Sequence, residues 1–239
     1  MNGIPAEARH GLEEVLARAV GVERARLDDE ESAESLTWCV FSHLLQTEEA
    51  AGVWPLLLGK EGPLPWPSAL LWGGEALGEQ AEYGREQLLA TTGGWAPDVL
   101  LEHWPDGLVM VMARSFRPAP VVADRARWAA ILERTDAFND PAGARQSGRA
   151  DLAQAWRTGA ELAGTRRFTL VELLRMPPRA PERVTTDLFR ASLREREDRQ
   201  FRQLSWRDLL ALLPPPWPEW LFRWAGARRL RPQSMVVAP

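Results

Sequence analysis

The chain contains very little cysteine, asparagine and lysine. Cys39 is its single cysteine, Lys60 its single lysine, and Asn2 and Asn139 are its two asparagines. A single cysteine excludes an intramolecular disulfide and any zinc site that is built from several cysteines. The three histidines, at positions 10, 43 and 103, are too scattered to form a histidine metal motif.

Long hydrophobic runs and a leader pattern are also missing. No segment approaches the roughly 20 consecutive apolar residues of a membrane-spanning helix, so we expect no membrane partner. Residues 1–20 do not place a basic start before an apolar stretch, as a secretory signal does. The sequence therefore predicts a cytoplasmic protein.

The composition is typical of a globular domain. Of the 239 residues, 45% are hydrophobic and 26% are charged, which supplies enough apolar side chain for a core. We expect residues 1–213 to form one domain, with an amphipathic helix over residues 5–20 as an extension. Residues 214–239 are rich in proline and tryptophan, and we expect them to form a helical appendage.

Charge is unevenly divided along the chain. Residues 1–140 carry 11 basic and 23 acidic side chains, whereas residues 141–239 carry 18 basic and 10 acidic ones. A basic half can indicate nucleic-acid binding. Two oppositely charged halves can equally attract one another within a fold, or the arginines can simply lie on the solvent-exposed faces of helices. Charge alone leaves these interpretations open.

Hydrophobic patterning indicates an α/β fold. The clearest predicted element is a hairpin. It consists of a strand at 99–102, a turn at 104–107 and a nearly continuous apolar strand at 108–115. The other strands are expected at 68–72 and 168–174. Helices are expected at 5–20, from the acidic residues 28–35 to about 46, and at 74–90, 122–135, 149–163, 185–203, 204–213 and 217–229, with loops at 51–67 and 139–148. This order predicts a mixed central sheet flanked by helices.

The hairpin carries a known pattern. Pro97 and Asp98 precede its first strand, and its second strand ends in Met112-Ala113-Arg114. The segment APDVLLEHWPDGLVMVMARS resembles the active-site hairpin of the PD-(D/E)XK nuclease superfamily. There, Pro-Asp and a hairpin are followed by an acid, any residue and lysine at the end of an apolar strand.

Other segments extend the resemblance over about residues 31–213. ESLTWCVFSHL resembles the family's first helix, with Glu34 at the position of its frequent glutamate. ADLAQAWRTGAEL, RRFTLVELL and LSWRDLLALL resemble the helix, the strand and the closing helix that follow. The resemblance implies a restriction-endonuclease-like fold, with extra helices at both ends of the chain.

The decisive positions depart from the family pattern. In the family, two carboxylates hold Mg²⁺ or Mn²⁺, which activates water beside the scissile phosphate. Asp98 matches the first carboxylate, but Met112 stands at the second, Arg114 at the lysine and Asp151 at a frequent glutamine. Methionine is no ligand for a hard cation, and arginine keeps its proton. The resemblance therefore predicts a degenerate, non-catalytic site without a cofactor. It implies a nucleic-acid-binding or scaffold module in which Arg114 and Arg117 contact phosphates.

A migrated nuclease site is the alternative. Glu102 and Asp98 share one face of their strand, because side chains alternate along a strand. Glu102 can therefore replace the missing acid, giving a site of Asp98, Glu102 and Glu34 that holds Mg²⁺ or Mn²⁺. Glu102 can equally be a rim carboxylate, and Arg114 can simply pair with Asp98 or Glu34.

A tryptophan stripe near the end of the chain is the last candidate. Trp217, Trp220 and Trp224 recur at helical spacing beside several arginines. Such a stripe suits a protein partner, self-association or stacking on unpaired bases. It equally suits the docking of the last helix on its own domain, so both interpretations stay open.

Overall fold

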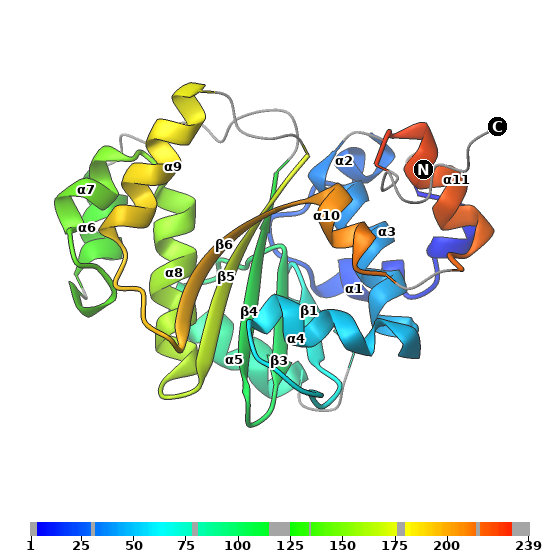
Figure 1. Ribbon diagram of the computed structural model, residues 1–239, viewed down its shortest axis with the longest axis horizontal. Helices are drawn as coiled ribbons and strands as arrows, with labels where there is room; N and C mark the ends of the chain where they lie inside the picture. Colours follow the sequence, from blue (N-terminus) through cyan, green and yellow to red (C-terminus); the bar gives the residue numbers. More distant parts are fainter. Residues whose placement is uncertain are drawn as a thin grey trace.

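The computed structural model describes residues 4–29, 32–77, 81–114, 125–133, 135–175, 180–213 and 216–230. These residues form an α/β structure in which a mixed six-stranded sheet stands between two layers of helices (Figure 1). The strands are β1 (Ser68–Leu71), β2 (Gly74–Leu77), β3 (Val99–His103), β4 (Gly107–Ala113), β5 (Arg167–Leu174) and β6 (Arg199–Ser205). The prediction of a mixed sheet flanked by helices is confirmed.

The sheet has the order β2-β1-β3-β4-β5-β6. Neighbouring strands from β2 to β4 are antiparallel, whereas β4, β5 and β6 are parallel. Parallel neighbours need a crossover connection, which α8 (Ala150–Ala163) and α9 (Ala180–Ser192) supply. The C-terminal ends of β4, β5 and β6 therefore lie at the end of the sheet where β3 begins.

Helices cover both faces of the sheet (Figure 1). The layer to the left in the figure comprises α8, α9, α5 (Ala81–Thr92), α6 (Arg125–Leu132) and α7 (Pro141–Gln146). The layer to the right comprises α1 (Leu12–Arg18), α2 (Arg24–Asp28), α3 (Ala33–Gln46), α4 (Val53–Leu58), α10 (Trp206–Ala211) and α11 (Glu219–Ala227). Short 3-10 helices span Ala6–Ala8, Glu48–Gly52 and Thr135–Ala137.

Strand β4 separates two hydrophobic cores. All seven of its residues are buried, as its continuous apolar sequence indicates. Val109 and Val111 pack with the layer that contains α3 and α4. Met110 and Met112 pack with the layer that contains α8. Alternate side chains of a strand point to opposite faces, so the even-numbered positions of β4 face α8.

Helix α8 lies close against the sheet. Its Trp156 is fully buried beside Phe168 of β5, with ring centroids 5.4 Å apart. Gly159 makes the close approach possible, because a Cβ at this position would overlap the ring of Phe168. The first turn of α8 consequently reaches the end of β4, where Asp151 pairs with Arg114.

Two predictions for the N-terminal part are wrong. The helix predicted at 5–20 is interrupted before α1, because Gly11 adopts a positive φ of 74°. The loop predicted at 51–67 begins with α4 instead, in which Trp54 and Leu58 are fully buried. Gly52 and Gly59 on either side of this short helix, and Pro55 within it, hide its apolar stripe.

Two central predictions also need correction. The helix predicted at 74–90 splits into β2 and α5. The loop predicted at 139–148 contains α7, because Asp140 caps this helix by accepting a hydrogen bond from the Gly143 N–H at 2.9 Å. Pro141 at the first helical position fits the same start.

A strand replaces part of the charged helix predicted at 185–203. Helix α9 ends at Ser192, and residues 199–205 form β6, which pairs in parallel with β5. Pairing with a central strand has overridden the helical preference of this charged segment. The helix predicted at 204–213 is confirmed as α10, which Ser205 and Asp208 begin with a reciprocal capping box.

The described residues 216–230 pack on the main body rather than standing apart from it. Trp217, Leu221 and Trp224 belong to the same core as Val109 and Val111. In the described ranges, no helix has the length and apolar character needed to cross a membrane.

Candidate functional site

A row of side chains crosses the sheet where β3 begins and where β4 and β5 end. Met112 pairs with Glu172 of β5, and Glu172 pairs with Gln203 of β6. Asp98 lies one residue before the first paired residue of β3 and continues the row beyond Met112. The row therefore reads Asp98, Met112, Glu172 and Gln203, on the face of the sheet that α8 covers.

Asp98 is held at the start of β3 by the end of β4. Its Oδ2 accepts a hydrogen bond from the backbone N–H of Ala113 at 2.7 Å. Burial is the largest influence and raises the pKa of Asp98 from 3.8 to about 6. The Ala113 N–H and Arg114 lower this pKa, and the charge of Glu34 raises it. The carboxyl therefore exchanges its proton close to neutral pH.

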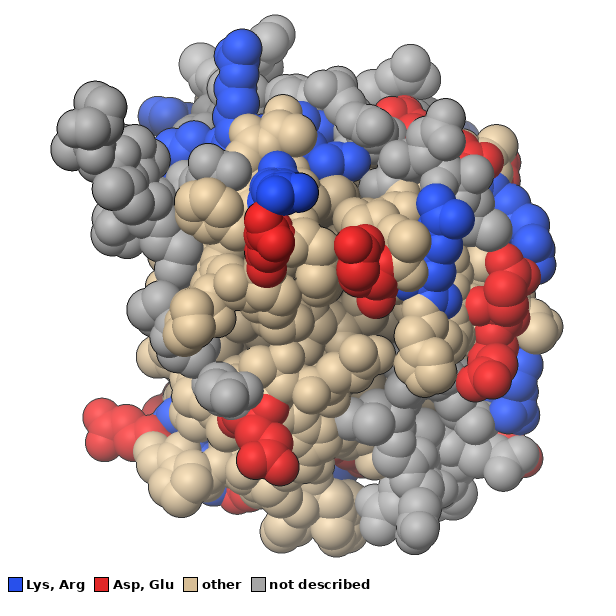
Figure 2. All heavy atoms as spheres, turned by 90° about the vertical axis from the view of Figure 1, so that its right-hand side faces the viewer, with Lys and Arg blue, Asp and Glu red and all other residues tan. Residues whose placement is uncertain are grey.

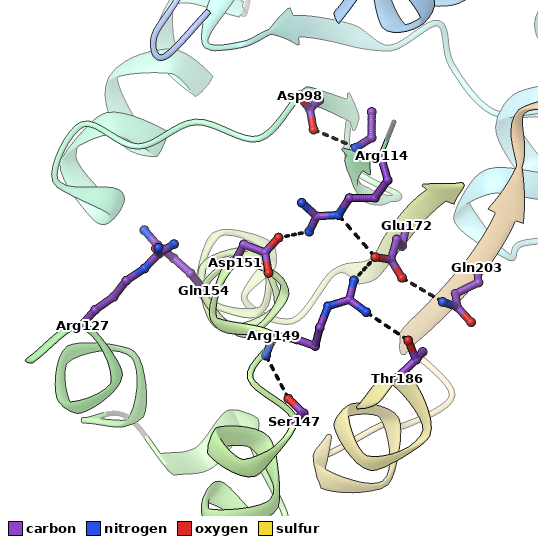
Figure 3. Close-up of polar contacts among 11 residues, drawn as sticks. Asp98, Arg114, Arg127, Ser147, Arg149, Asp151, Gln154, Glu172, Thr186 and Gln203 are labelled. Atoms are coloured by element: carbon purple, nitrogen blue, oxygen red, sulfur yellow. Dashed lines mark hydrogen bonds and ion pairs between the residues drawn. The ribbon is translucent and has the colours of Figure 1, made fainter. Parts of the chain in front are cut away.

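Arg114 is enclosed by two carboxylates (Figure 3). Its guanidinium forms an ion pair with Asp151 in the first turn of α8, and its Nε lies 3.4 Å from Oε1 of Glu172. Only 17% of the side chain is exposed. Burial lowers the pKa of Arg114, and the charge of Glu172 raises it. Arginine keeps its proton even so, which makes Arg114 a counterion for both carboxylates.

Glu172 is fully buried and binds three other side chains. Arg149, immediately before α8, forms an ion pair with Oε1 and donates to Thr186 Oγ1 at 3.0 Å. Gln203 donates through Nε2 to Oε2 of Glu172 at 2.8 Å. Arg114, Arg149, Asp151 and Glu172 together carry no formal net charge, which is the condition under which ionised groups tolerate burial. We call these four residues the arginine–carboxylate network.

Glu34 lies in the first turn of α3, on the other side of Asp98. Ser32 begins this helix by accepting a hydrogen bond from the backbone N–H of Ser35 at 2.9 Å. The Glu34 carboxylate pairs with Arg26 at 2.9 Å and is 13% exposed. Glu34 and Asp98 line one pocket of about 440 Å³, so the structure brings these two predicted site residues together.

Glu102 does not join Asp98 and Glu34. It lies four residues after Asp98, at the opposite end of β3, which is about 13 Å away at the rise of a strand. Its carboxylate pairs with Arg166 at 2.5 Å, and the Arg166 guanidinium lies 4.7 Å from the centre of the Trp104 ring. The structure therefore does not bring Glu102 together with Asp98 and Glu34, as the migrated site would require. A shared strand face does not bring its two ends together.

The residues at the end of β4 do not fit the divalent metal ion that the family pattern binds. Met112 offers a thioether where a hard cation needs oxygen. Arg114 places a positive charge close enough to Asp98, the carboxylate of the family pattern that is present, to lower its pKa. Within the part of the chain that the structure covers, no three His, Cys, Asp or Glu side chains gather to hold a metal ion.

The predicted tryptophan stripe packs inward. Trp217 and Trp224 are only 9% and 5% exposed. The Trp220 ring lies edge-on to His43 of α3, with centroids 5.9 Å apart. The stripe therefore docks α11 on the body of the protein. This agrees with the interpretation of the stripe as a contact of the last helix with its own domain. Arg117, the other predicted phosphate ligand, lies outside the described residues.

Sequence reasoning missed Glu172, Arg149 and Gln203. A signal for Glu172 was present, because it is the only acidic residue in the apolar strand 168–174, and a buried carboxylate demands a partner. Gln203 was hidden, because a helix was predicted where β6 forms. Only the parallel pairing of β5 and β6 places it beside Glu172.

Comparisons of the chain with protein-family models, curated proteins and solved structures find no match.

Proposed function

We propose that the chain is a nuclease-like binding module without hydrolytic activity, related to the PD-(D/E)XK superfamily. A single observation carries this proposal. At the position of the family's lysine stands Arg114, which is already bound by Asp151 and Glu172. A side chain that neutralises two carboxylates is not available to orient a nucleophile, and Met112 supplies no oxygen ligand at the position of the family's second metal-binding carboxylate.

The order of the elements supports the family part of the proposal. Helix α3 carries Glu34, and the β3–β4 hairpin carries Asp98, Met112 and Arg114. Helix α8 and the parallel strand β5 follow, then the capped helix α10. This is the sequence of helix, hairpin, helix, strand and closing helix that the resemblance implies.

Nucleic acid is the ligand class that the resemblance implies. Because Arg114 is already paired with two carboxylates, other arginines must contact the phosphates. Arg145 of α7 and Arg190 of α9 are exposed on two helices that pack together. Figure 2 shows the side of the molecule that lies to the right in Figure 1, where acidic and basic side chains are interspersed around an uncharged centre. The described residues of that side form no continuous basic patch, which favours α7 and α9 as the place where nucleic acid is bound.

Cleavage assays test the absence of hydrolysis. The full chain is incubated with single- and double-stranded DNA and RNA in Mg²⁺ or Mn²⁺, beside Asp98→Ala. We expect no cleavage above the level of the variant. Metal-dependent cleavage that Asp98→Ala abolishes would overturn the proposal.

A double variant tests whether the positions are assigned correctly. Met112→Glu with Arg114→Lys restores the acid and the lysine of the family pattern beside Asp98. We expect this variant to bind Mn²⁺ in calorimetry where the original chain does not. Mn²⁺ binding of equal strength by both proteins would contradict the assignment of residues 112 and 114.

Salt-dependent binding tests the nucleic-acid part. Fluorescence anisotropy of a labelled oligonucleotide is followed over a salt series, because phosphate contacts release counterions. We expect Arg145→Gln with Arg190→Gln to reduce the salt dependence, and Arg223→Gln on α11 to leave it unchanged. If the original chain shows no salt-dependent binding, the scaffold role remains and the nucleic-acid role does not.

A further inference from the structure

The pocket beside Asp98 is lined by both carboxylates and aromatic rings. It has a volume of about 440 Å³, and the side chains that characterise it are Glu34, Asp98, Trp72 and Trp95. Residues 20–22, 93–94 and 96 complete the lining. This volume lies within the range of about 300–1,000 Å³ that small-molecule sites occupy.

Trp72 contributes a buried N–H donor. Its side chain is 3% exposed, and its Nε1 makes no hydrogen bond of regular geometry. The indole N–H does interact with the Asp98 carboxyl, whose pKa it lowers. One face of the indole is supported by Trp38, with ring centroids 6.5 Å apart and an interplanar angle of 20°. The pocket therefore has a rigid aromatic wall next to a polar group that a ligand can satisfy.

Asp98 is poised to bind a cation. Its Oδ2 is occupied by the Ala113 N–H, and burial disfavours its ionised form. A cation in the pocket would offset that unfavourable burial, since an opposite charge within a few ångströms favours the ionised carboxylate. Glu34 adds a second acidic side chain from a different element.

The lining selects an organic cation over a metal ion. Indole rings supply no oxygen ligand, but their faces attract organic cations, with tryptophan the strongest of the aromatic side chains. A guanidinium matches carboxylates especially well, because its planar N–H groups donate in a fixed fork. Within the chain, Glu34 already binds one guanidinium, that of Arg26, at 2.9 Å.

We propose that this pocket binds a guanidinium-bearing cation, which donates N–H groups to Asp98 and Glu34 and stacks on the tryptophan wall. The inference rests on the proposed function in one respect, since it takes the site around Asp98 to hold no catalytic metal ion. The guanidinium can belong to a free small molecule or to an arginine side chain of a peptide. The chemistry in the pocket is the same in both cases.

Calorimetry on the full chain tests the proposal. The ligands are agmatine, L-arginine and a short blocked peptide with one arginine, with L-citrulline as the uncharged analogue. We expect saturable binding of at least one guanidinium ligand, and citrulline binding that is roughly tenfold weaker or more, because a charged hydrogen-bond pair is lost. Stronger binding of the peptide than of agmatine identifies a protein segment as the source, and the reverse order identifies a small molecule.

Three variants locate the binding. Asp98→Asn and Glu34→Gln should each weaken it roughly tenfold or more. Glu102→Gln is the matched control, because its carboxylate lies on the same strand but outside the pocket, and it should leave the affinity unchanged. Thermal unfolding checks that each variant is folded. Binding should also strengthen as the pH rises through about 6, where Asp98 ionises.

Several outcomes would overturn the inference. They are the absence of saturable binding by all three guanidinium ligands, equal binding of citrulline, and affinities that Asp98→Asn and Glu34→Gln do not change. Cleavage assays on the same preparations keep the two proposals apart. Metal-dependent cleavage overturns the proposed function whatever the pocket binds, whereas absent cleavage with absent cation binding overturns this inference alone.

Discussion

Arg114 and Glu172 connect two parallel strands through their side chains, with Nε of Arg114 3.4 Å from Oε1 of Glu172. The backbone N–H of Arg114 also donates to Leu173 O at 2.8 Å, so the contact closes the end of the β4–β5 pair. Arg149 approaches the same carboxylate oxygen from the start of α8. One buried oxygen thus fixes two arginines that come from different elements.

Neutralising Glu172 should therefore destabilise the protein strongly. Glu172→Gln leaves Arg114 and Arg149 buried without this counterion. Breaking a buried ion pair in this way costs about 3–5 kcal/mol of unfolding free energy, which urea denaturation measures. Glu219→Gln is the control, because the Glu219–Arg223 pair on α11 is 76% exposed on both sides. Its loss should cost less than about 0.5 kcal/mol. Equal effects of the two substitutions would contradict the role of the network.

Asp98 should make stability fall as the pH rises. Its pKa is about 6 in the folded state against 3.8 as the ordinary value, so the folded state binds the extra proton between these two pH values. Stability decreases with pH wherever the folded state binds more protons. The Asp98→Asn variant stays neutral at every pH and therefore does not lose this stability. The difference in unfolding free energy between the variant and the original chain should shift in favour of the variant by about 3 kcal/mol between pH values below 4 and above 6. Urea denaturation over this range measures the difference, and a constant difference would contradict the raised pKa.

Trp224 should behave as a core residue. Truncation of a buried tryptophan to alanine costs about 3–5 kcal/mol. Trp224→Ala should lose stability by this amount in urea denaturation without changing the oligomeric state. Trp104 is 59% exposed, and Trp104→Ala should cost much less. A change of oligomeric state in Trp224→Ala with unaltered stability would instead support the interpretation as an interaction site.

Gly159 should not tolerate a larger residue. A Cβ at this position overlaps the Phe168 ring, so Gly159→Ala must separate α8 from β5. Overpacking of this kind costs about 1–3 kcal/mol, which chemical denaturation detects. Gly52 is the control, because a Cβ there has no neighbour within 4 Å and its φ is −70°. Gly52→Ala should leave stability unchanged or raise it by up to about 1 kcal/mol.

Local patterns in the sequence were sufficient to predict the hairpin and helix α8. The continuous apolar run at 108–113 forms β4, and the apolar stripe at 150–163 forms α8. Both segments are long enough for their periodicity to decide between strand and helix. Short segments such as α4 and β2 escaped prediction, because a few residues between glycines and prolines carry too little periodicity.

The candidate site was only partly predictable for a different reason. Asp98, Glu34 and Arg114 were found because they belong to a linear pattern. The partners of Arg114 depend on which strands lie side by side and in which register. Glu172 is 58 residues from Arg114 along the chain, and only the parallel pairing of β4 and β5 brings the two together.

The two outer strands of the sheet restrict how copies of this chain can associate. β2 has only four residues, and its pairing with β1 is irregular between Ala69 and Leu70. β6, at the other edge, has Arg199 and Arg202 among its seven residues. Short length, irregular pairing and charge each oppose the addition of a strand from another chain. Growth of the sheet into an intermolecular ribbon is thus disfavoured at both edges, which favours association of copies through other surfaces, such as the helical layers.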